Sequence, residues 1–335
     1  MEEVPHVRIG QNADLLVVAP ATADILAKAA HGLASDLLTN TLLTARCPVV
    51  FAPAMHTEMW EHPATRANVA TLRARGAIVI EPAVGRLTGA DSGKGRLPDP
   101  SAIFEVCRNV LKGVVPDLAG RRVVVSAGGT REAIDPVRFI GNRSSGMQGY
   151  ALARVAAARG AAVTLVAANV SLPDPAGVDL VRVESALQLR EEVLAAAVEA
   201  DVVVMAAAVA DFRPVAPSRT KIKKTGDEPE AIHLTKNPDI LAELGERRRA
   251  GVPSPAVIAG FAAETDDVLA NGQAKMARKG CDLLVVNQVG ENLAFGTPDN
   301  AATVLVAGGD PVEIPRGPKD DLAGVVWDLI AARLV

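Results

Sequence analysis

The residues best suited to chemistry lie between residues 121 and 159. An apolar run at 121–126 leads into the turn Gly128-Gly129-Thr130, and Ser144-Ser145-Gly146 then opens a helical pattern from Met147 to Arg159. A strand that ends in glycines, followed by a helix that starts with small and hydroxyl residues, presents backbone N–H groups to a phosphate. Because the spacing is not a regular G-x-G-x-x-G, a tight turn without a ligand is the alternative interpretation.

Polar residues also follow the later apolar runs. Asp211 ends a strand-like run that begins at Asp201, so its carboxylate is expected in the cleft at the carboxyl ends of the strands. A helix or turn cap is the other role open to it. Asn237-Pro238 is typical of a helix start, with Asn as the cap and Pro at the first helical position. The free N–H groups of that helix could also hold an anion.

Lysines and one aromatic residue complete this set. Lys221 and the lysines after it lie in the polar segment 214–230, which is a candidate lid, although a solvated charge run is the plainer interpretation. Lys275 and Lys279 share one helix face, where a common anionic ligand would offset their repulsion. Phe261 follows a strand and either stacks on a base or fills the core. These features predict a nucleoside triphosphate site on a Rossmann-like sheet, without specifying the reaction.

Apolar runs that alternate with amphipathic segments predict an α/β fold of parallel strands with right-handed crossovers. Strands are expected at about 14–19, 48–52, 77–80, 121–126, 162–167, 201–206, 256–261 and 282–286, with a hairpin at 303–315 and a closing helix at 319–333. The glycine-rich segment 85–96 is expected to be mobile. Prolines between Leu97 and Leu118 mark the boundary of two domains, residues 1–116 and 117–335.

Composition excludes several classes of protein. The formal net charge is −4 without a basic block, which argues against a dedicated nucleic-acid binder. No apolar run reaches the roughly 20 residues that a transmembrane helix needs, and the acidic start has no signal-peptide pattern. Cys47, Cys107 and Cys281 are scattered without metal-site spacing, as in reduced cytosolic proteins. We therefore expect a cytoplasmic protein with neither a membrane nor a nucleic-acid partner.

Specific motifs in the second half resemble phosphopantothenate–cysteine ligase, the C-terminal half of the bifunctional bacterial enzyme of coenzyme A synthesis. The motifs stand in the family's order: Gly-Gly-Thr-Arg-Glu-Ala-Ile-Asp-Pro-Val-Arg (128–138), Asn-Arg-Ser-Ser-Gly (142–146), Ala-Ala-Val-Ala-Asp (207–211), Lys-Ile-Lys-Lys (221–224), Lys-Asn-Pro-Asp-Ile-Leu (236–241) and Gly-Phe-Ala-Ala-Glu-Thr (260–265). The resemblance implies that the carboxylate of 4'-phosphopantothenate attacks the α-phosphate of CTP. The amine of L-cysteine then displaces CMP from the acyl-cytidylate.

The resemblance also assigns roles to residues. It implies that Asn142 holds the acyl-cytidylate and that Mg²⁺ accompanies the triphosphate. Its CTP contacts would be Met205, Ala206, Ala207, Asp211, Lys221, Pro238, Asp239, Ile240, Leu241, Phe261, Lys275 and Lys279. Where the family often has a lysine after Ser-Ser-Gly, this chain has Met147, so another cation must replace it if that lysine aids phosphate binding. No other metal ligand is identified.

The first half is similar to the family's flavin-dependent phosphopantothenoylcysteine decarboxylase. His6 corresponds to the catalytic histidine, and Pro20, Ala21, Thr22 and Ala23 to the segment that contacts FMN. Two positions depart from the family's motifs: His56 stands where many members have asparagine, and Gly89 stands at the position of the usual catalytic cysteine.

The family's first βαβ unit, with its flavin-phosphate loop, would precede Met1. The resemblance therefore implies an N-terminally truncated chain: a partial flavodoxin-like decarboxylase domain followed by a Rossmann-like ligase domain with a parallel sheet. We expect weak or no FMN binding and little decarboxylase activity. The resemblance also implies a homo-oligomer, with dimeric ligase halves that join into a larger assembly if the decarboxylase half is complete.

Two other functional classes stay open at this point. A nicotinamide-dependent oxidoreductase is disfavoured because no acidic residue stands at the expected ribose position after a regular glycine fingerprint. A non-catalytic nucleotide-binding module is the second alternative. CTP rather than ATP is inherited from the resemblance and is not indicated by the residues themselves.

Overall fold

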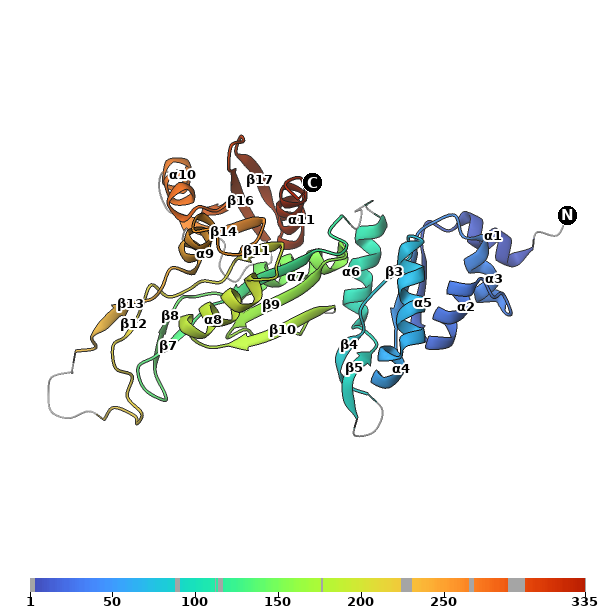
Figure 1. Ribbon diagram of the computed structural model, residues 1–335, viewed down its shortest axis with the longest axis horizontal. Coiled ribbons are helices and arrows are strands. Elements are labelled where there is room, and N and C mark those ends of the chain that lie inside the picture. Colours follow the sequence, from blue (N-terminus) through green and yellow to red (C-terminus); the bar gives the residue numbers. More distant parts are fainter. Residues whose placement is uncertain are drawn as a thin grey trace. The chain divides into compact units, whose positions relative to one another are not determined.

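The computed structural model describes residues 4–87, 91–111, 113, 117–175, 177–223, 231–264, 268–288 and 299–334. The chain folds as two compact units (Figure 1). The first comprises Met1–Pro116 with Pro175–Gly177, and the second comprises Asp117–Asp174 with Val178–Val335. Within the described residues, no helix combines the length and apolar character that crossing a membrane requires.

The first unit contains a three-stranded parallel sheet in the order β1-β2-β3. Its elements are α1 (Pro5–Asn12), β1 (Leu16–Ala21), α2 (Ala23–His31), α3 (Leu37–Thr44), β2 (Val49–Pro53), α4 (Thr57–Glu61), α5 (Pro63–Ala74), β3 (Ile78–Val79), β4 (Ala83–Arg86), β5 (Ser92–Arg96) and α6 (Pro100–Leu111). Leu26, Phe51 and Trp60 are buried in its core. The three strands expected in this half are confirmed, since each β-element overlaps its apolar run.

The glycine-rich segment 85–96, expected to be mobile, is paired where the structure describes it, at residues 85–86 and 92–96. Strands β4 and β5 pair antiparallel, and the Met55 N–H donates to the Gly95 carbonyl oxygen at 2.9 Å. A Cβ at Gly95 would lie 2.2 Å from the Met55 carbonyl oxygen. The glycines that suggested mobility therefore allow β5 to approach the backbone after β2.

The second unit is built on an eight-stranded sheet in the order β10-β9-β6-β11-β14-β15-β16-β17. Six strands, β10 to β15 in the sheet order, are parallel. Strand β16 pairs antiparallel with β15, and β17 pairs antiparallel with β16. The strands are β6 (Arg122–Gly128), β9 (Ala162–Ala168), β10 (Val178–Val183), β11 (Val202–Met205), β14 (Val257–Glu264), β15 (Leu283–Gln288), β16 (Asp299–Val306) and β17 (Val312–Pro318). The five strands, the hairpin and the parallel arrangement expected here are confirmed.

Helices cover both faces of this sheet. They are α7 (Met147–Ala158), α8 (Ala186–Ala197), α9 (Ile240–Arg249), α10 (Val268–Lys279) and α11 (Lys319–Ala331). Side chains alternate between faces along each strand, so Val123 and Val125 of β6 pack with α7 and α11. The neighbouring Val124 packs with α8 and α9 on the other face.

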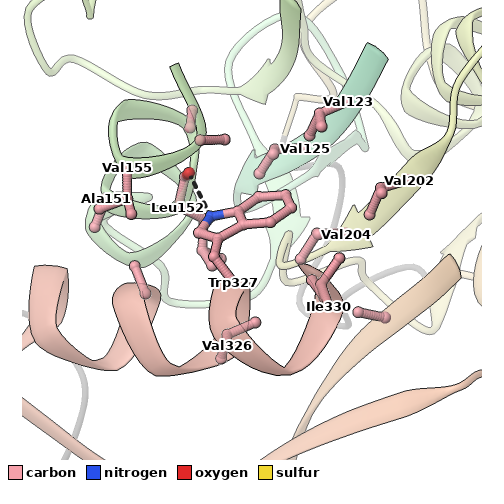
Figure 2. Close-up of a cluster of buried hydrophobic side chains, with 14 of the residues drawn as sticks. Val123, Val125, Ala151, Leu152, Val155, Val202, Val204, Val326, Trp327 and Ile330 are labelled. Atoms are coloured by element: carbon pink, nitrogen blue, oxygen red, sulfur yellow. Dashed lines mark hydrogen bonds between the residues drawn. The ribbon is translucent and has the colours of Figure 1, made fainter. Parts of the chain in front are cut away.

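Trp327 of α11 is the largest fully buried side chain of the unit. Figure 2 shows its indole among Val125 and Val204 of the sheet and Leu152 of α7. Its Nε1–H donates to the Leu152 carbonyl oxygen at 2.9 Å, so the buried ring has no unsatisfied donor. Removing such a side chain typically costs about 3–5 kcal/mol, so this contact fixes α11 against α7 and the sheet.

Two short antiparallel ribbons extend from the second unit: β7 (Arg131–Ala133) with β8 (Phe139–Gly141), and β12 (Phe212–Pro214) with β13 (Leu234–Lys236). The predicted lid therefore begins inside a paired strand, and its described part continues to residue 223. Ser218 N–H donates to the Ile134 carbonyl oxygen at 2.9 Å, which ties this segment to the β7–β8 turn. The described part is thus anchored and is not a free flap.

Candidate functional site

A cavity of about 850 Å³ opens in the second unit, at the carboxyl edge of the large sheet. Ligands of open parallel α/β sheets bind at this edge. All the predicted nucleotide-site residues except Lys221 line it: Asn142, Met205, Ala206, Ala207, Asp211, Pro238, Asp239, Ile240, Leu241, Phe261, Lys275 and Lys279. The fold therefore gathers residues that are widely separated in the sequence around one cavity.

The glycine turn after β6 allows α7 to start at the cavity wall. Gly128 has φ +85°, and a Cβ there would lie 2.0 Å from the Ala168 carbonyl oxygen. A Cβ at Gly149 would lie 2.5 Å from the Ala127 Cβ, so only glycine lets α7 pack this closely on β6. The helix has no side-chain N-cap at Gly146, and its first residues line the cavity. The Met147 N–H donates to the Ser145 hydroxyl at 3.5 Å, and the dipole of the helix favours an anion beside its first turn.

Asn142 is held by the loop that follows β11. Its Nδ2 donates to the Val209 carbonyl oxygen at 2.9 Å. The loop after β11 is also joined to the glycine turn at the end of β6, because the Ala208 N–H donates to the Gly128 carbonyl oxygen at 2.8 Å. The Ala210 N–H donates to the buried Thr130 hydroxyl at 2.9 Å. The backbone that carries Asn142 and Asp211 is therefore fixed before any ligand arrives.

The start of α9 differs from its prediction. Asp239, rather than Asn237, is the N-cap: its Oδ1 accepts the Ala242 N–H at 3.1 Å. The Asn237 side chain instead donates to the Ala210 carbonyl oxygen at 2.8 Å and accepts from Arg213 at 3.0 Å. The Asn237 amide therefore stabilises the neighbouring loop and does not cap α9. The Asn-Pro pattern in the sequence does not distinguish these two roles.

The described lining of the cavity carries more positive than negative groups. Its cations are Arg143, Lys236, Lys275, Lys279 and Lys319, and its carboxylates are Asp211 and Asp239. The Lys279 ammonium lies 3.2 Å from an Asp239 carboxylate oxygen, which orients it beside the start of α9. This excess of positive charge suits an anionic ligand such as a polyphosphate.

Lys221 is exposed and does not line the cavity. Its neighbour Ile222 is held by the β7–β8 turn: the buried Asp135 carboxylate accepts the Ile222 N–H at 3.1 Å, and Arg138 donates to the Ile222 carbonyl oxygen at 3.1 Å. The Arg138 side chain, with further hydrogen bonds from backbone N–H groups, holds the pKa of Asp135 well below its usual range. Asp135 therefore stays ionised and anchors the chain next to Lys221.

The first unit holds the remaining predicted residues. His6 lies in α1, and Pro20 and Ala21 end β1. The Thr22 hydroxyl caps α2 by accepting the Ile25 N–H at 3.3 Å. His56 precedes α4, with its Nδ1 3.9 Å from an Asp91 carboxylate oxygen. Gly89 lies outside the described residues.

Four polar residues of the described cavity lining were missed by the sequence analysis. They are Gln148, Asn287, Asn300 and Lys319, and they come from α7, β15, β16 and α11. None stands in a recognisable motif. The available signal was topological: because β16 runs antiparallel to β15, its first residues return to the carboxyl edge where β15 ends.

The cysteines do not line this cavity. Cys281 is buried, and burial raises the pKa of its thiol to about 11. Because the thiolate is the nucleophilic form, this thiol is not activated at neutral pH. Chemistry at the cavity is therefore left to bound groups and to the lysines, amides and backbone of its wall.

Comparison with known proteins identifies the family. The family described as "DNA/pantothenate metabolism flavoprotein C-terminal domain" matches residues 118–334, and that described as "Flavoprotein" matches residues 1–112. The coenzyme A biosynthesis bifunctional protein CoaBC of Mycolicibacterium smegmatis is 58% identical over 100% of this chain and 83% of its own length. That of Bacillus subtilis is 41% identical over 98% and 80%. The chain belongs to the CoaBC family.

Solved structures agree with this family. The crystal structure of the C-terminal domain of a coenzyme A biosynthesis bifunctional protein CoaBC is similar with a TM-score of 0.55 and 35% identity. It covers 65% of this chain and 98% of that domain. The resemblance stated from the motifs is therefore confirmed, as is an α/β fold with a flavoprotein part followed by the C-terminal domain. A nicotinamide oxidoreductase is not favoured.

Proposed function

We propose that residues 117–335, which include the whole second unit, join L-cysteine to 4'-phosphopantothenate at the expense of CTP, as a step of coenzyme A biosynthesis. The observation that carries the proposal is the cavity at the carboxyl edge. The nucleotide-site residues that the resemblance names, with the exception of Lys221, line a single cavity with an excess of positive charge. Membership of the CoaBC family supplies the class of reaction.

The proposed reaction has two displacements. The carboxylate of phosphopantothenate attacks the α-phosphorus of CTP, and pyrophosphate leaves to give an acyl-cytidylate. The cysteine amine then attacks the acyl carbon, CMP leaves, and the amine loses its proton to solvent. The protein need not supply a nucleophile, so positioning and charge neutralisation carry the catalysis.

The nucleotide is proposed to lie over the ends of β11 and β14, beside α9 and α10. Lys275 and Lys279 would neutralise the triphosphate, and Phe261 would pack on the nucleotide. The backbone of Met205 to Ala207 and the Asp211 carboxylate would meet the remaining polar groups. Lys221 would reach the nucleotide from the anchored segment beside Asp135.

Mg²⁺ is proposed to arrive with the triphosphate. In the part of the chain that the structure describes, no group of three or more His, Cys, Asp and Glu side chains could hold a metal ion. Mg²⁺ usually binds through one or two protein carboxylates together with substrate phosphates. The Asp211 carboxylate at the cavity wall is therefore enough as the protein ligand of a Mg²⁺–nucleotide complex. The donor set therefore fits a metal–nucleotide complex and not a resident metal.

The first unit, residues 1–116, is proposed to bind FMN at the end of β1. Thr22 and the first N–H groups of α2 provide donors, and Pro20 is exposed beside them. This donor set fits the polar edge of a flavin ring, which supplies hydride-accepting chemistry when bound. His6 and His56 remain proposed decarboxylase residues. Gly89, where related decarboxylases carry a cysteine, has no proton to donate.

A second copy of the chain is proposed to cover the two ribbons of the ligase unit. Large apolar side chains are exposed on and beside them: Val137, Phe139, Phe212, Val215, Ile232 and Leu234. Sedimentation of the wild-type chain and of Phe139→Asp tests this, because a charge in a self-associating apolar face dissociates it. A wild-type chain that sediments as a monomer would remove the proposal.

The ligase proposal is tested by a pyrophosphate-release assay with CTP, phosphopantothenate and cysteine. We expect pyrophosphate release that requires phosphopantothenate and CMP release that requires cysteine as well. A non-catalytic nucleotide-binding module would bind CTP and release neither product. Replacing CTP by ATP in the same assay tests the choice of nucleotide.

A further inference from the structure

The cavity has a second polar wall that the nucleotide proposal leaves without a role. Gln148, Asn287, Asn300 and Lys319 line the cavity on the side of the sheet covered by α7 and α11. The proposed nucleotide contacts Lys275 and Lys279 come from α10, which packs on the opposite face. The cavity therefore spans both faces of the sheet edge, with a cationic residue on each side.

The second wall is a connected hydrogen-bond network. Asn300 Nδ2 donates to Gln148 Oε1 at 3.3 Å and to Asn287 Oδ1 at 3.4 Å. Gln148 Nε2 donates to the Lys319 carbonyl oxygen at 3.2 Å. Since the Asn287 oxygen accepts from Asn300, its NH₂ group is the end turned away from the network. The four residues hold one another in place although they come from four separate elements.

Lys319 is 8% exposed, which is rare for a lysine. Its Nζ donates to the Asp299 carbonyl oxygen at 3.1 Å, which holds the ammonium near the start of β16. Burial lowers the pKa of Lys319, and the nearby Asp299 carboxylate opposes that shift. A buried cation is costly, and an anion that enters the cavity would stabilise its charged form.

We propose that Lys319 binds the 4'-phosphate of the acyl substrate and thereby sets the preference of the ligase for phosphorylated over unphosphorylated pantothenate. The inference rests on the proposed ligase function, which names the substrate. Two anionic substrates must occupy the cavity together, and the triphosphate is assigned to the α9–α10 side. Met147 opens α7 without a charge. The other cations of the described lining come from α10, from β13 (Lys236) and from the loop before α7 (Arg143), so Lys319 is the lining cation that α11 supplies.

The test compares Lys319→Met with the wild-type enzyme in steady-state ligation, using phosphopantothenate and pantothenate as alternative acyl substrates. We expect the KM for phosphopantothenate to rise at least about 10-fold, as for the loss of a charge-assisted hydrogen bond. The KM for CTP should stay within about 2-fold, and the selectivity for the phosphorylated substrate should fall in proportion. Lys319→Arg should restore part of that selectivity.

Arg316→Met is the matched control, because Arg316 is an exposed cation on the same strand end and does not line the cavity. The Arg316→Met variant should leave the KM for phosphopantothenate and the KM for CTP unchanged. A Lys319→Met enzyme with lower kcat but unchanged selectivity would overturn the proposal, since it would mean that Lys319 only braces β16 against α11. If Lys319→Met loses its thermal unfolding transition, Lys319→Gln, which keeps a donor for the Asp299 carbonyl, gives the same comparison.

A calorimetric titration separates this inference from the ligase proposal. Phosphopantothenate and pantothenate are titrated into the wild-type chain and the folded Lys319 variant without CTP. If the wild-type chain releases no pyrophosphate, the ligase proposal fails. A phosphate-dependent affinity that is lost in the variant would still support Lys319. Equal affinity of both chains for phosphopantothenate would overturn the inference whatever the enzyme assay shows.

Discussion

At the scale of single residues, the Asn142 side chain has a defined orientation at the cavity wall. Its nitrogen donates to the Val209 carbonyl oxygen, so its oxygen is the end left to accept a proton from a ligand. In the proposed reaction, the attacking cysteine amine is the group that carries such protons. We therefore propose that Asn142 orients the cysteine amine in the second displacement.

We predict that Asn142→Ala consumes CTP and releases pyrophosphate but accumulates the acyl-cytidylate, because the amine is no longer oriented for attack. A single turnover with CTP labelled at the α-phosphate, quenched and separated by chromatography, measures the intermediate and CMP. Asn142→Asp, which keeps an acceptor oxygen, should accumulate less intermediate than Asn142→Ala. Normal CMP release by Asn142→Ala would show that the role is wrong.

Spacing alone located some site residues but not others. Asp211 follows an apolar run and Lys275 and Lys279 share a helix face, so the sequence placed them at the cavity wall. Asn300 and Lys319 carry no such pattern. They reach the site only because β16 and β17 reverse the chain direction, which depends on long-range pairing and not on local residue types.

At the scale of elements, the contact between α7 and β6 decides how closely the site can be assembled. Gly149 sits in the first turn of α7 against Ala127, with no room for a Cβ. Helix propensity alone favours alanine over glycine by about 1 kcal/mol inside a helix. At Gly149 the lack of room for a Cβ opposes that preference. Helix propensity and packing therefore predict opposite effects of an alanine at this position on the stability of the unit.

We predict that Gly149→Ala destabilises the second unit by about 1–3 kcal/mol, the usual cost of overpacking. Gly324→Ala in α11 is the matched control: nothing lies within 4 Å of its Cβ position, so it should stabilise by up to about 1 kcal/mol. Urea unfolding is followed by Trp327 fluorescence in a Trp60→Phe background, which removes the tryptophan of the first unit. Two stabilised variants would contradict the packing argument.

Elements with strong periodicity were predicted, and short exposed ones were not. The buried runs of β6, β11 and β15 are continuous apolar stretches, as for strands covered on both faces. The edge strand β10 carries Asp179 and Arg182 among its apolar residues and was missed. The three-residue ribbons β7–β8 and β12–β13 lack enough length for any period to show.

At the scale of the whole molecule, each unit has a core of its own. Phe51 and Trp60 belong to the core of the first unit, and Trp327 and Tyr150 to that of the second. Domains with separate cores can fold and bind ligands separately. The flavin and ligase proposals can therefore be tested independently on the same chain.

We predict that Thr22→Ala lowers FMN affinity severalfold and leaves CTP-dependent ligation unchanged. The hydroxyl that caps α2 is lost, and with it one proposed donor to the flavin. Thr22→Ser, which keeps both functions of the hydroxyl, is the control. Affinity is measured by quenching of FMN fluorescence. Equal affinities of Thr22→Ala and the wild-type chain would exclude this segment from the flavin site.

The antiparallel pair β16–β17 has a practical consequence for changing substrate preference. Because the chain turns back twice after β15, its final helix begins at the same rim as the glycine turn near the start of the unit. Variant libraries aimed at accepting unphosphorylated pantothenate analogues should therefore concentrate on residues 299–319. Randomising the glycine turn would instead disturb the scaffold that both substrates share.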